Sequence, residues 1–141
     1  AGQEDAAVQS AITALMGAGY QADGIVMTPA MASALAAIKY SGVPAFPELA
    51  WGGNPERVKG LASDITTALA FDSSADDALV GDFTNAFKWG YAKDIPIEVI
   101  EYGDPDNAGS DLKGHNQVYL RCEAYIGWAV LDGNAFAKIE A

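Results

Sequence analysis

The chain has 141 residues and a mass of 14.7 kDa, which suits one domain or two small ones. Half of its residues are apolar and a tenth are aromatic, which excludes a disordered chain. A single cysteine and a single histidine exclude an internal disulfide framework and Cys/His zinc sites of the structural type. Eight basic and nineteen acidic residues give a net charge of −11, which argues against nucleic-acid binding through phosphate neutralisation.

The first forty residues predict a helix, a strand and a second helix. Apolar residues at spacings of three and four predict a helix over about 4–16, and the apolar run 24–27 predicts a buried strand. Thr28 is a typical N-cap and Pro29 suits the first helical position, so a helix should begin there. Its apolar stripe ends near residue 41. No apolar run reaches the roughly 18 residues of a membrane span.

Residues 42–60 are rich in proline and glycine and predict a long loop, which contains Trp51. A tryptophan in such a loop is either a packing anchor or a contact residue for a partner. We expect Trp51 to be a packing anchor, because an indole buries a large apolar area.

The remainder of the chain is typical of β-structure. Short strands are predicted at 79–80, 88–92 and 95–100, and a polar loop at 103–114. The strongest pattern follows, with apolar residues at every second position of Val118, Leu120, Cys122, Ala124, Ile126, Trp128 and Val130. It predicts one very long strand with one buried face, or two strands separated by a bulge at Gly127, with the Cys122 thiol buried. The order of elements indicates an α+β fold with a mainly antiparallel sheet.

Candidate sites for chemistry are weak. The segment that begins at Asp104 resembles a calcium loop at Asp104, Asp106 and Gly109, but Ala108 and His115 occupy two ligand positions, so we expect a solvated turn. The acidic segment 72–77 is likewise expected to be a turn. His115 is the only imidazole and is best explained as a loop residue. Phosphate-binding glycine motifs are absent from the sequence.

Several short segments resemble the C-terminal part of a tailed-bacteriophage major capsid protein of the Hong Kong 97 type. Residues 80–83 resemble the G-D-F turn of that family, and a polar loop and a long alternating strand over 116–131 follow it. Residues 135–137 match its terminal A-F motif, and 25–29 resemble its I-V-M-x-P segment. At 58–61 the family places a G-x-P before a strand, whereas this sequence has Ala62 instead of the proline.

The resemblance implies a structural role without a cofactor, a metal or a reaction. It implies that residues 1–141 form a fragment of a larger subunit, with an axial-type region over about 6–80 and a strand-rich region over about 81–141 that includes part of the peripheral-type sheet. The expected partners are copies of the chain in capsomers, around packaged DNA that this segment encloses but does not bind sequence-specifically, with no membrane contact. The expected location is the virion capsid, assembled in the cytoplasm of a host bacterium.

The resemblance also suggests a crosslink. In some members an isopeptide bond forms between a Lys and an Asn, with the participation of a Glu seven residues after the Asn, and Asn116 and Glu123 have this spacing. The Lys would come from a part of the subunit outside this chain. Because seven is odd, a regular strand would place the two residues on opposite faces, so a bulge would be needed. The alternative is an Asn at the start of a strand and a solvated Glu.

Two other functions stay open at this point. The first is a shell protein of the encapsulin type, which encloses cargo enzymes instead of DNA. The second is a small acidic enzyme or metal-binding domain that uses the loop at 104–111.

Overall fold

The computed structural model describes residues 3–69, 76–93 and 95–140 and divides into two compact units. Unit 1 comprises Ala1–Lys88 and Val130–Ala141, and unit 2 comprises Trp89–Ala129. The expected axial-type region at about 6–80 and strand-rich region at about 81–141 stay predictions.

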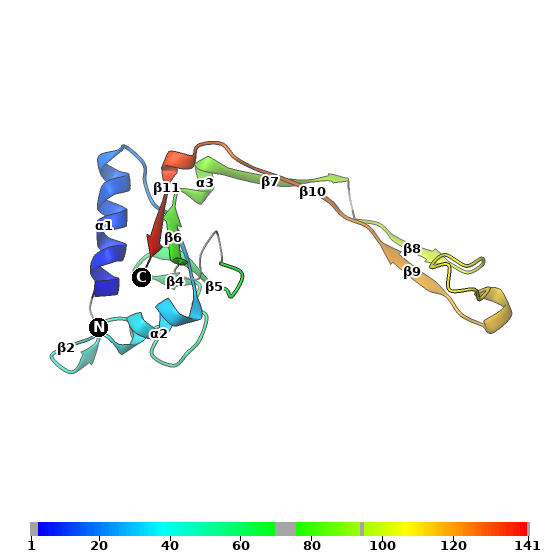
Figure 1. The fold of residues 1–141 in the computed structure, drawn as a ribbon, viewed down its shortest axis with the longest axis horizontal. Coiled ribbons are helices and arrows are strands. Elements are labelled where there is room, and N and C mark those ends of the chain that lie inside the picture. Colours follow the sequence, from blue (N-terminus) through cyan, green and yellow to red (C-terminus); the bar gives the residue numbers. More distant parts are fainter. Residues whose placement is uncertain (1–2, 70–75, 94, 141) are drawn as a thin grey trace. The chain divides into compact units, whose positions relative to one another are not determined.

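Unit 1 combines helices with a five-stranded sheet (Figure 1). In chain order its elements are α1 (Gln3–Gly17), β1 (Gly24–Met27), α2 (Pro29–Ala37), β2 (Lys39–Tyr40), β3 (Val43–Pro44), β4 (Arg57–Val58), β5 (Leu61–Ile65), β6 (Asp76–Gly81), α3 (Phe83–Ala86), the 3₁₀ turn η2 (Gly133–Ala135) and β11 (Phe136–Glu140). The predicted helix–strand–helix start is confirmed.

The start of α2 follows from its local sequence. The Thr28 hydroxyl accepts a hydrogen bond from the Met31 amide at 3.2 Å, and Pro29 occupies the first turn. The helix ends at Ala37, earlier than predicted. Residues beyond it form the β2–β3 hairpin, whose turn needs positive φ at Ser41 (52°) and Gly42 (83°).

The strand order of the large sheet is β11-β6-β1-β5-β4. The β1–β5 pair is parallel, and the pairs β11–β6, β6–β1 and β4–β5 are antiparallel. The predicted α+β fold with a mainly antiparallel sheet is therefore confirmed.

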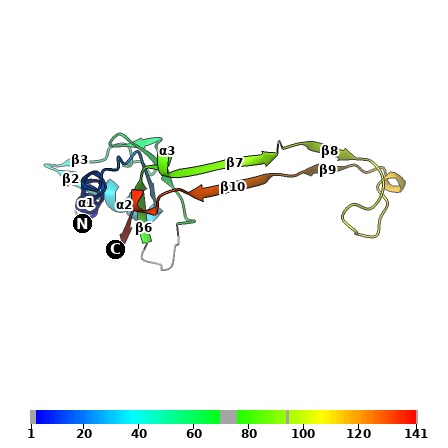
Figure 2. The same cartoon turned by 90° about the horizontal axis from the view of Figure 1, so that it is seen from above.

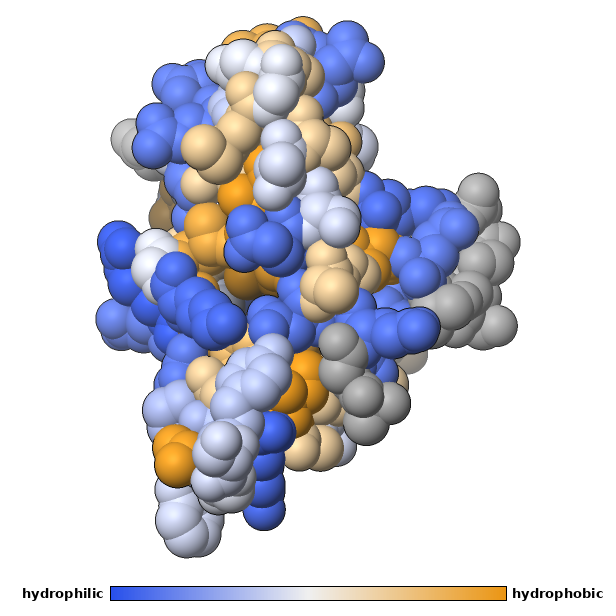
Figure 3. Space-filling view, turned by 90° about the vertical axis from the view of Figure 1, so that its left-hand side faces the viewer, coloured by the Kyte–Doolittle hydropathy of each residue, from blue (hydrophilic) through white to orange (hydrophobic). Residues whose placement is uncertain are grey.

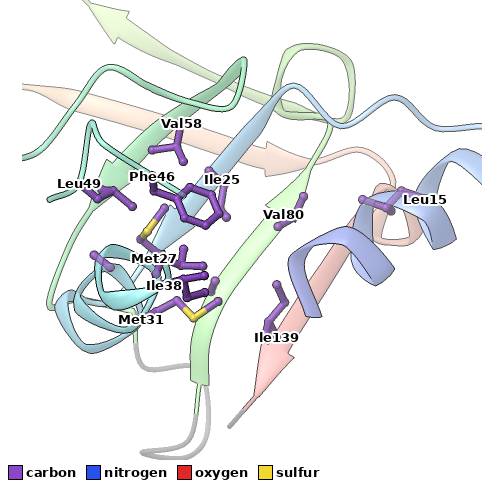
Figure 4. Close-up of a cluster of buried hydrophobic side chains, with 13 residues drawn as sticks. Leu15, Ile25, Met27, Met31, Ile38, Phe46, Leu49, Val58, Val80 and Ile139 are labelled. Carbon is purple, nitrogen blue, oxygen red and sulfur yellow. The ribbon is translucent and has the colours of Figure 1, made fainter. Parts of the chain in front are cut away.

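The core of unit 1 lies on one face of this sheet. Ile25 of β1 is opposite Val80 of β6, and both side chains are buried among residues of α1 and α2 (Figure 4). Neighbours in an antiparallel register share a face, so the strands present one apolar surface to the helices. The core contains Leu15, Ile25, Met27, Met31, Ala32, Leu35, Ile38, Phe46, Leu49, Val58, Ala78, Val80 and Ile139.

Unit 2 is built on two-stranded pairings. Strand β7 (Phe87–Lys93) pairs with β10 (Tyr125–Val130), and β8 (Ile97–Ile100) pairs with β9 (Tyr119–Cys122) (Figure 2). A polar loop with the 3₁₀ turn η1 (Lys113–His115) connects β8 to β9. The strands predicted at 88–92 and 95–100 are confirmed.

The prediction of one very long strand, or of two strands separated by a bulge at Gly127, is wrong. The segment forms β9 and β10, and the break lies at Glu123 and Ala124 and not at Gly127. Cys122 is opposite Ile97, so an uninterrupted register would place Glu123 opposite Pro96. Proline has no N–H to donate to a ladder, which explains why the pairing stops there.

Candidate assembly surfaces

The β8–β9 pair has one apolar face and one mixed face, which carries Glu98, Arg121, Ile100 and Tyr119. Its register places Ile97 opposite Cys122 and Val99 opposite Leu120, so these four side chains share a face. Glu98 is opposite Arg121 on the other face. We call this set of four the ribbon face.

The ribbon face is exposed. Ile97 is 73% exposed and Leu120 65%, and the Cys122 thiol is exposed as well. The prediction that this alternating segment buries one face, with Cys122 inside, is therefore wrong for the chain by itself. The alternation indicated a surface that is suited to burial, but a two-stranded ribbon has no layer of its own to cover it.

Large apolar side chains are exposed on and beside the strands of unit 2. Trp128 of β10 is 71% exposed, and the rings of Trp89 and Tyr91 on β7 stack edge to face at 5.5 Å. The exposed set in this unit is Trp89, Tyr91, Ile95, Ile97, Val99, Tyr102, Val118, Tyr119, Leu120, Tyr125, Ile126 and Trp128. So many exposed large apolar side chains on one small unit favour a protein interaction surface.

The loop between β8 and β9 is ordered by its own carboxylates. Asp104 accepts hydrogen bonds from the amides of Ala108 (2.9 Å) and Gly109 (2.7 Å), and Asp111 from those of Gly103 and Gly114 (both 3.0 Å). The bond from Gly109 is the main reason why the pKa of Asp104 lies below its ordinary value. The acidic residues therefore have backbone partners, as expected for a turn.

The other candidates for chemistry are not brought together. Over 3–69, 76–93 and 95–140, no group of three or more His, Cys, Asp or Glu side chains is arranged to hold a metal ion. The His115 ring contacts the Asp111 carbonyl oxygen at 2.9 Å and is exposed. Residues 72–75 of the turn predicted at 72–77 lie outside the described residues, and its last two residues, Asp76 and Asp77, begin β6, so the prediction is wrong for them. Nor is any described helix long and apolar enough to cross a bilayer.

A comparison with protein families decides to which family the chain belongs. The sequence matches the model of the phage capsid family over residues 1–141.

The chain belongs to the phage capsid family.

Solved structures agree with the family. A structure from Mycobacterium phage Ogopogo is similar over 97% of this chain, with a TM-score of 0.74 and 27% identity. A structure from Gordonia phage Cozz covers 91%, with a TM-score of 0.66 and 30% identity. The capsid of an empty GTA particle shares the fold over 95%, with a TM-score of 0.64 and 23% identity. No curated protein matches the sequence.

The chain spans about half the length of the solved structures that it matches: 49% of the Ogopogo chain, 42% of the Cozz chain and 43% of the GTA chain. More than half of each matched chain therefore has no counterpart in these 141 residues.

The segment that resembles the G-D-F turn of the capsid family forms a compact junction between β6 and α3. Asp82 caps α3 through the Asn85 amide at 3.0 Å and is buried. Asp23, which the sequence analysis missed, reaches the same helix and accepts hydrogen bonds from the amides of Phe83 (2.8 Å) and Thr84 (3.0 Å) and from the Thr84 hydroxyl. No local signal marks Asp23, because its partners lie 60 and 61 residues away in the sequence.

Asn116 and Glu123 lie outside regular strand. Asn116 ends η1 with a positive φ of 56°, and Glu123 follows β9, where its carboxylate pairs with the Arg121 guanidinium. This partner raises the pKa of Arg121. Because β9 lies between the two residues and contains neither, strand alternation does not decide whether they face the same side. The crosslink stays a prediction.

Trp51 is not a packing anchor. It is 96% exposed, so this prediction is wrong for the chain by itself. The residues that anchor the loop are Phe46 and Leu49, both of which are buried in the core.

Proposed function

We propose that the chain is part of the structural subunit of an icosahedral capsid of a tailed phage or prophage, and that it assembles through contacts with copies of itself. The observation that carries this proposal is the exposed ribbon face. Burial of one Val, Leu or Ile side chain stabilises by about 1.5–3 kcal/mol relative to exposure. Coverage of Ile97, Val99 and Leu120 in a shell would therefore contribute several kcal/mol for each subunit.

The role proposed for this segment is structural and includes no reaction. The acidic groups of the loop at 104–111 have backbone hydrogen-bond partners, which supports a scaffolding role for them over a ligand-binding one. The net charge of −11 supports a wall that encloses DNA without binding it through this segment. The proposed location is the virion, with assembly in the cytoplasm of the host bacterium and without membrane contact.

The rival within the fold, an encapsulin-type shell, differs in what it encloses. The family match and the capsid structures favour the phage shell. The contents of the particle discriminate directly between the two, since a virion holds DNA and a compartment holds enzymes.

The test is to purify particles from a culture that carries this gene and to identify their proteins by mass spectrometry. Trypsin cleaves after Arg121 and Lys138, so the peptide 122–138 is diagnostic. We expect it among the most abundant peptides of nuclease-resistant, DNA-containing particles. Its absence from every DNA-containing fraction, or its presence only in particles filled with enzyme, would overturn the proposal.

The crosslink through Asn116 and Glu123 is a separate proposal that the same particles test. A covalent shell gives a ladder of subunit multimers in denaturing electrophoresis, and Asn116→Ala removes it. A single monomer band from intact particles would instead support the alternative, in which Glu123 is a solvated partner of Arg121.

A further inference from the structure

Helix α1 is anchored unevenly along its length. Leu15, near the end of the helix, is buried and belongs to the core of unit 1 (Figure 4). The next residues hold this end in place, since the Tyr20 amide donates to the Leu15 carbonyl oxygen at 2.9 Å and the Tyr20 hydroxyl to the Asp132 carboxylate at 2.6 Å. Among the described residues of α1 before Leu15, no side chain is fully buried. The end of the helix is therefore fixed more firmly than its start.

The first part of α1, residues 3–12, covers a cavity. On this side of the molecule, apolar residues lie among hydrophilic ones (Figure 3). The cavity measures about 160 Å³, and its apolar lining consists of Val8, Ile12, Ile25, Leu35, Phe46, Val58 and Leu61. Atoms that face a void lack the dispersion contacts of a close-packed core, so the first part of α1 gains less from packing than the end does. It therefore depends on other contacts to stay in place.

Asp5, in the first turn of α1, makes such contacts. One oxygen of its carboxylate accepts a hydrogen bond from the Tyr40 hydroxyl at 2.9 Å, and the other lies 3.4 Å from the Lys59 ammonium. Tyr40 belongs to β2, and Lys59 lies in the turn between β4 and β5. A single carboxylate therefore joins the start of α1 to two segments that are 35 and 54 residues away in the sequence. We call these three residues the clasp.

Lys59 is held in position by its own surroundings. Its backbone has a positive φ of 46°, which is uncommon for a residue with a side chain and costs conformational energy. Its amide donates to the Glu48 carboxylate at 3.3 Å, and its ammonium lies 4.4 Å from the centre of the buried Phe46 ring, which attracts a cation. These contacts offset the backbone strain, so Lys59 is a fixed partner for the Asp5 carboxylate.

We infer that residues 3–12 of α1 open and close over the cavity independently of the rest of unit 1, and that the clasp holds them closed. Local opening of this kind is expected where few buried contacts hold an element. Opening uncovers Val8, Ile12 and the lining beneath them, so the clasp sets how often unit 1 presents an apolar surface here. This conformational device goes beyond the proposed function and does not depend on it.

The test measures hydrogen exchange of single α1 amides by NMR in the 141-residue chain. Asp5 also interacts with the positive end of the helix dipole, so a change at Asp5 would loosen α1 even without a clasp. The informative substitutions are therefore Tyr40→Phe, which removes the hydrogen bond, and Lys59→Gln, which removes the ion pair. Lys39→Gln is the matched control, because it removes the same charge one residue before Tyr40 and lies outside the clasp.

We expect Tyr40→Phe and Lys59→Gln each to raise the exchange rates of the amides of residues 7–12 about three- to tenfold, without a change at residues 15–18. Asp5→Asn should raise the same rates, and Lys59→Gln should add nothing to it, because the ion pair is then already lost. Lys39→Gln should leave all these rates unchanged.

The inference is overturned if either Tyr40→Phe or Lys59→Gln gives the same rates as Lys39→Gln. An equal rise along the whole of α1 would also overturn it, because the helix would then open as one unit. Additive effects of Asp5→Asn and Lys59→Gln would show that the two residues act separately and that no clasp exists. These outcomes do not bear on peptide 122–138 in virions, so failure of this inference and failure of the proposed function are distinguishable.

Discussion

Gly81 occupies the tightest position at the junction of β6 and β11. A Cβ atom there would overlap the Phe136 ring and lie 2.8 Å from the Ala135 carbonyl oxygen. We expect Gly81→Ala to lower the free energy of unfolding by about 2–3 kcal/mol, because the obstacle includes backbone that cannot move aside cheaply. Gly133→Ala is the matched control, since nothing lies within 4 Å of its Cβ position. Equal denaturation midpoints for the two variants would contradict this packing.

Asp23 predicts a defined pH dependence. Burial raises the pKa of its carboxyl, but the hydrogen bonds from Thr84 and the Phe83 amide outweigh that effect and hold the pKa below the ordinary value of 3.8. Its charged form therefore stabilises the fold above the ordinary pKa, and this contribution is lost as the pH falls through the lowered value. We expect Asp23→Asn to be less stable than the wild type at pH 7, with a gap in melting temperature that narrows below about pH 4. A gap that is constant from pH 7 to pH 2 would rule out this linkage.

For single residues, the sequence predicts roles that depend on adjacent residues, but not roles that depend on residues far along the chain. Thr28 and Pro29 identify the start of α2 because a cap is a property of adjacent residues. The partners of Asp23 belong to a helix far along the chain, so the fold must be known before its role is visible. The exposure of Trp51 was not predictable either, because hydrophobicity shows that an indole is suited to burial but not whether its own chain buries it.

In the strands of unit 2, the ribbon face is exposed, although the sequence predicted a buried face. Leu120→Glu and Val99→Glu should change the unfolding free energy of the isolated chain by less than about 0.5 kcal/mol, as is usual for exposed sites. The same variants should fail to enter particles, because each places a charge in a surface that the shell buries. Glu98→Gln, on the opposite face, is the control and should be incorporated normally. Loss of folding in isolated Leu120→Glu would show that this face is already buried in the free chain.

The strand pattern was predictable from alternation, but its continuity and partners were not. The alternating residues from Val118 to Val130 correctly indicate β-structure, since side chains in a strand repeat every second position. The break at Glu123 lies where the register would continue to Pro96, the residue before β8, and only the register shows that the two would be opposite. Alternation also cannot show whether the apolar face has a covering layer within the same chain.

The 141 residues as a whole span about half of the solved chains that they match. We predict that this segment by itself stays a monomer, a dimer or a small ring, because surfaces such as the ribbon face have no cover in it. The net charge of −11 should oppose nonspecific aggregation. Sedimentation velocity at several concentrations, with negative-stain microscopy, measures this directly. Closed shells from the segment by itself would contradict the prediction.

In the proposed shell, neighbouring subunits cover the apolar surface that unit 2 exposes in the free chain. Hydrogen exchange of the amides in β8 and β9, compared between the isolated chain and purified particles, tests it most directly. A two-stranded ribbon is marginally stable in water, so these amides should exchange rapidly in the isolated chain. In particles they should exchange at least about a hundredfold more slowly, because coverage adds several kcal/mol to the cost of opening. Equal exchange in both samples would show that this surface stays exposed in the shell and would contradict its proposed burial.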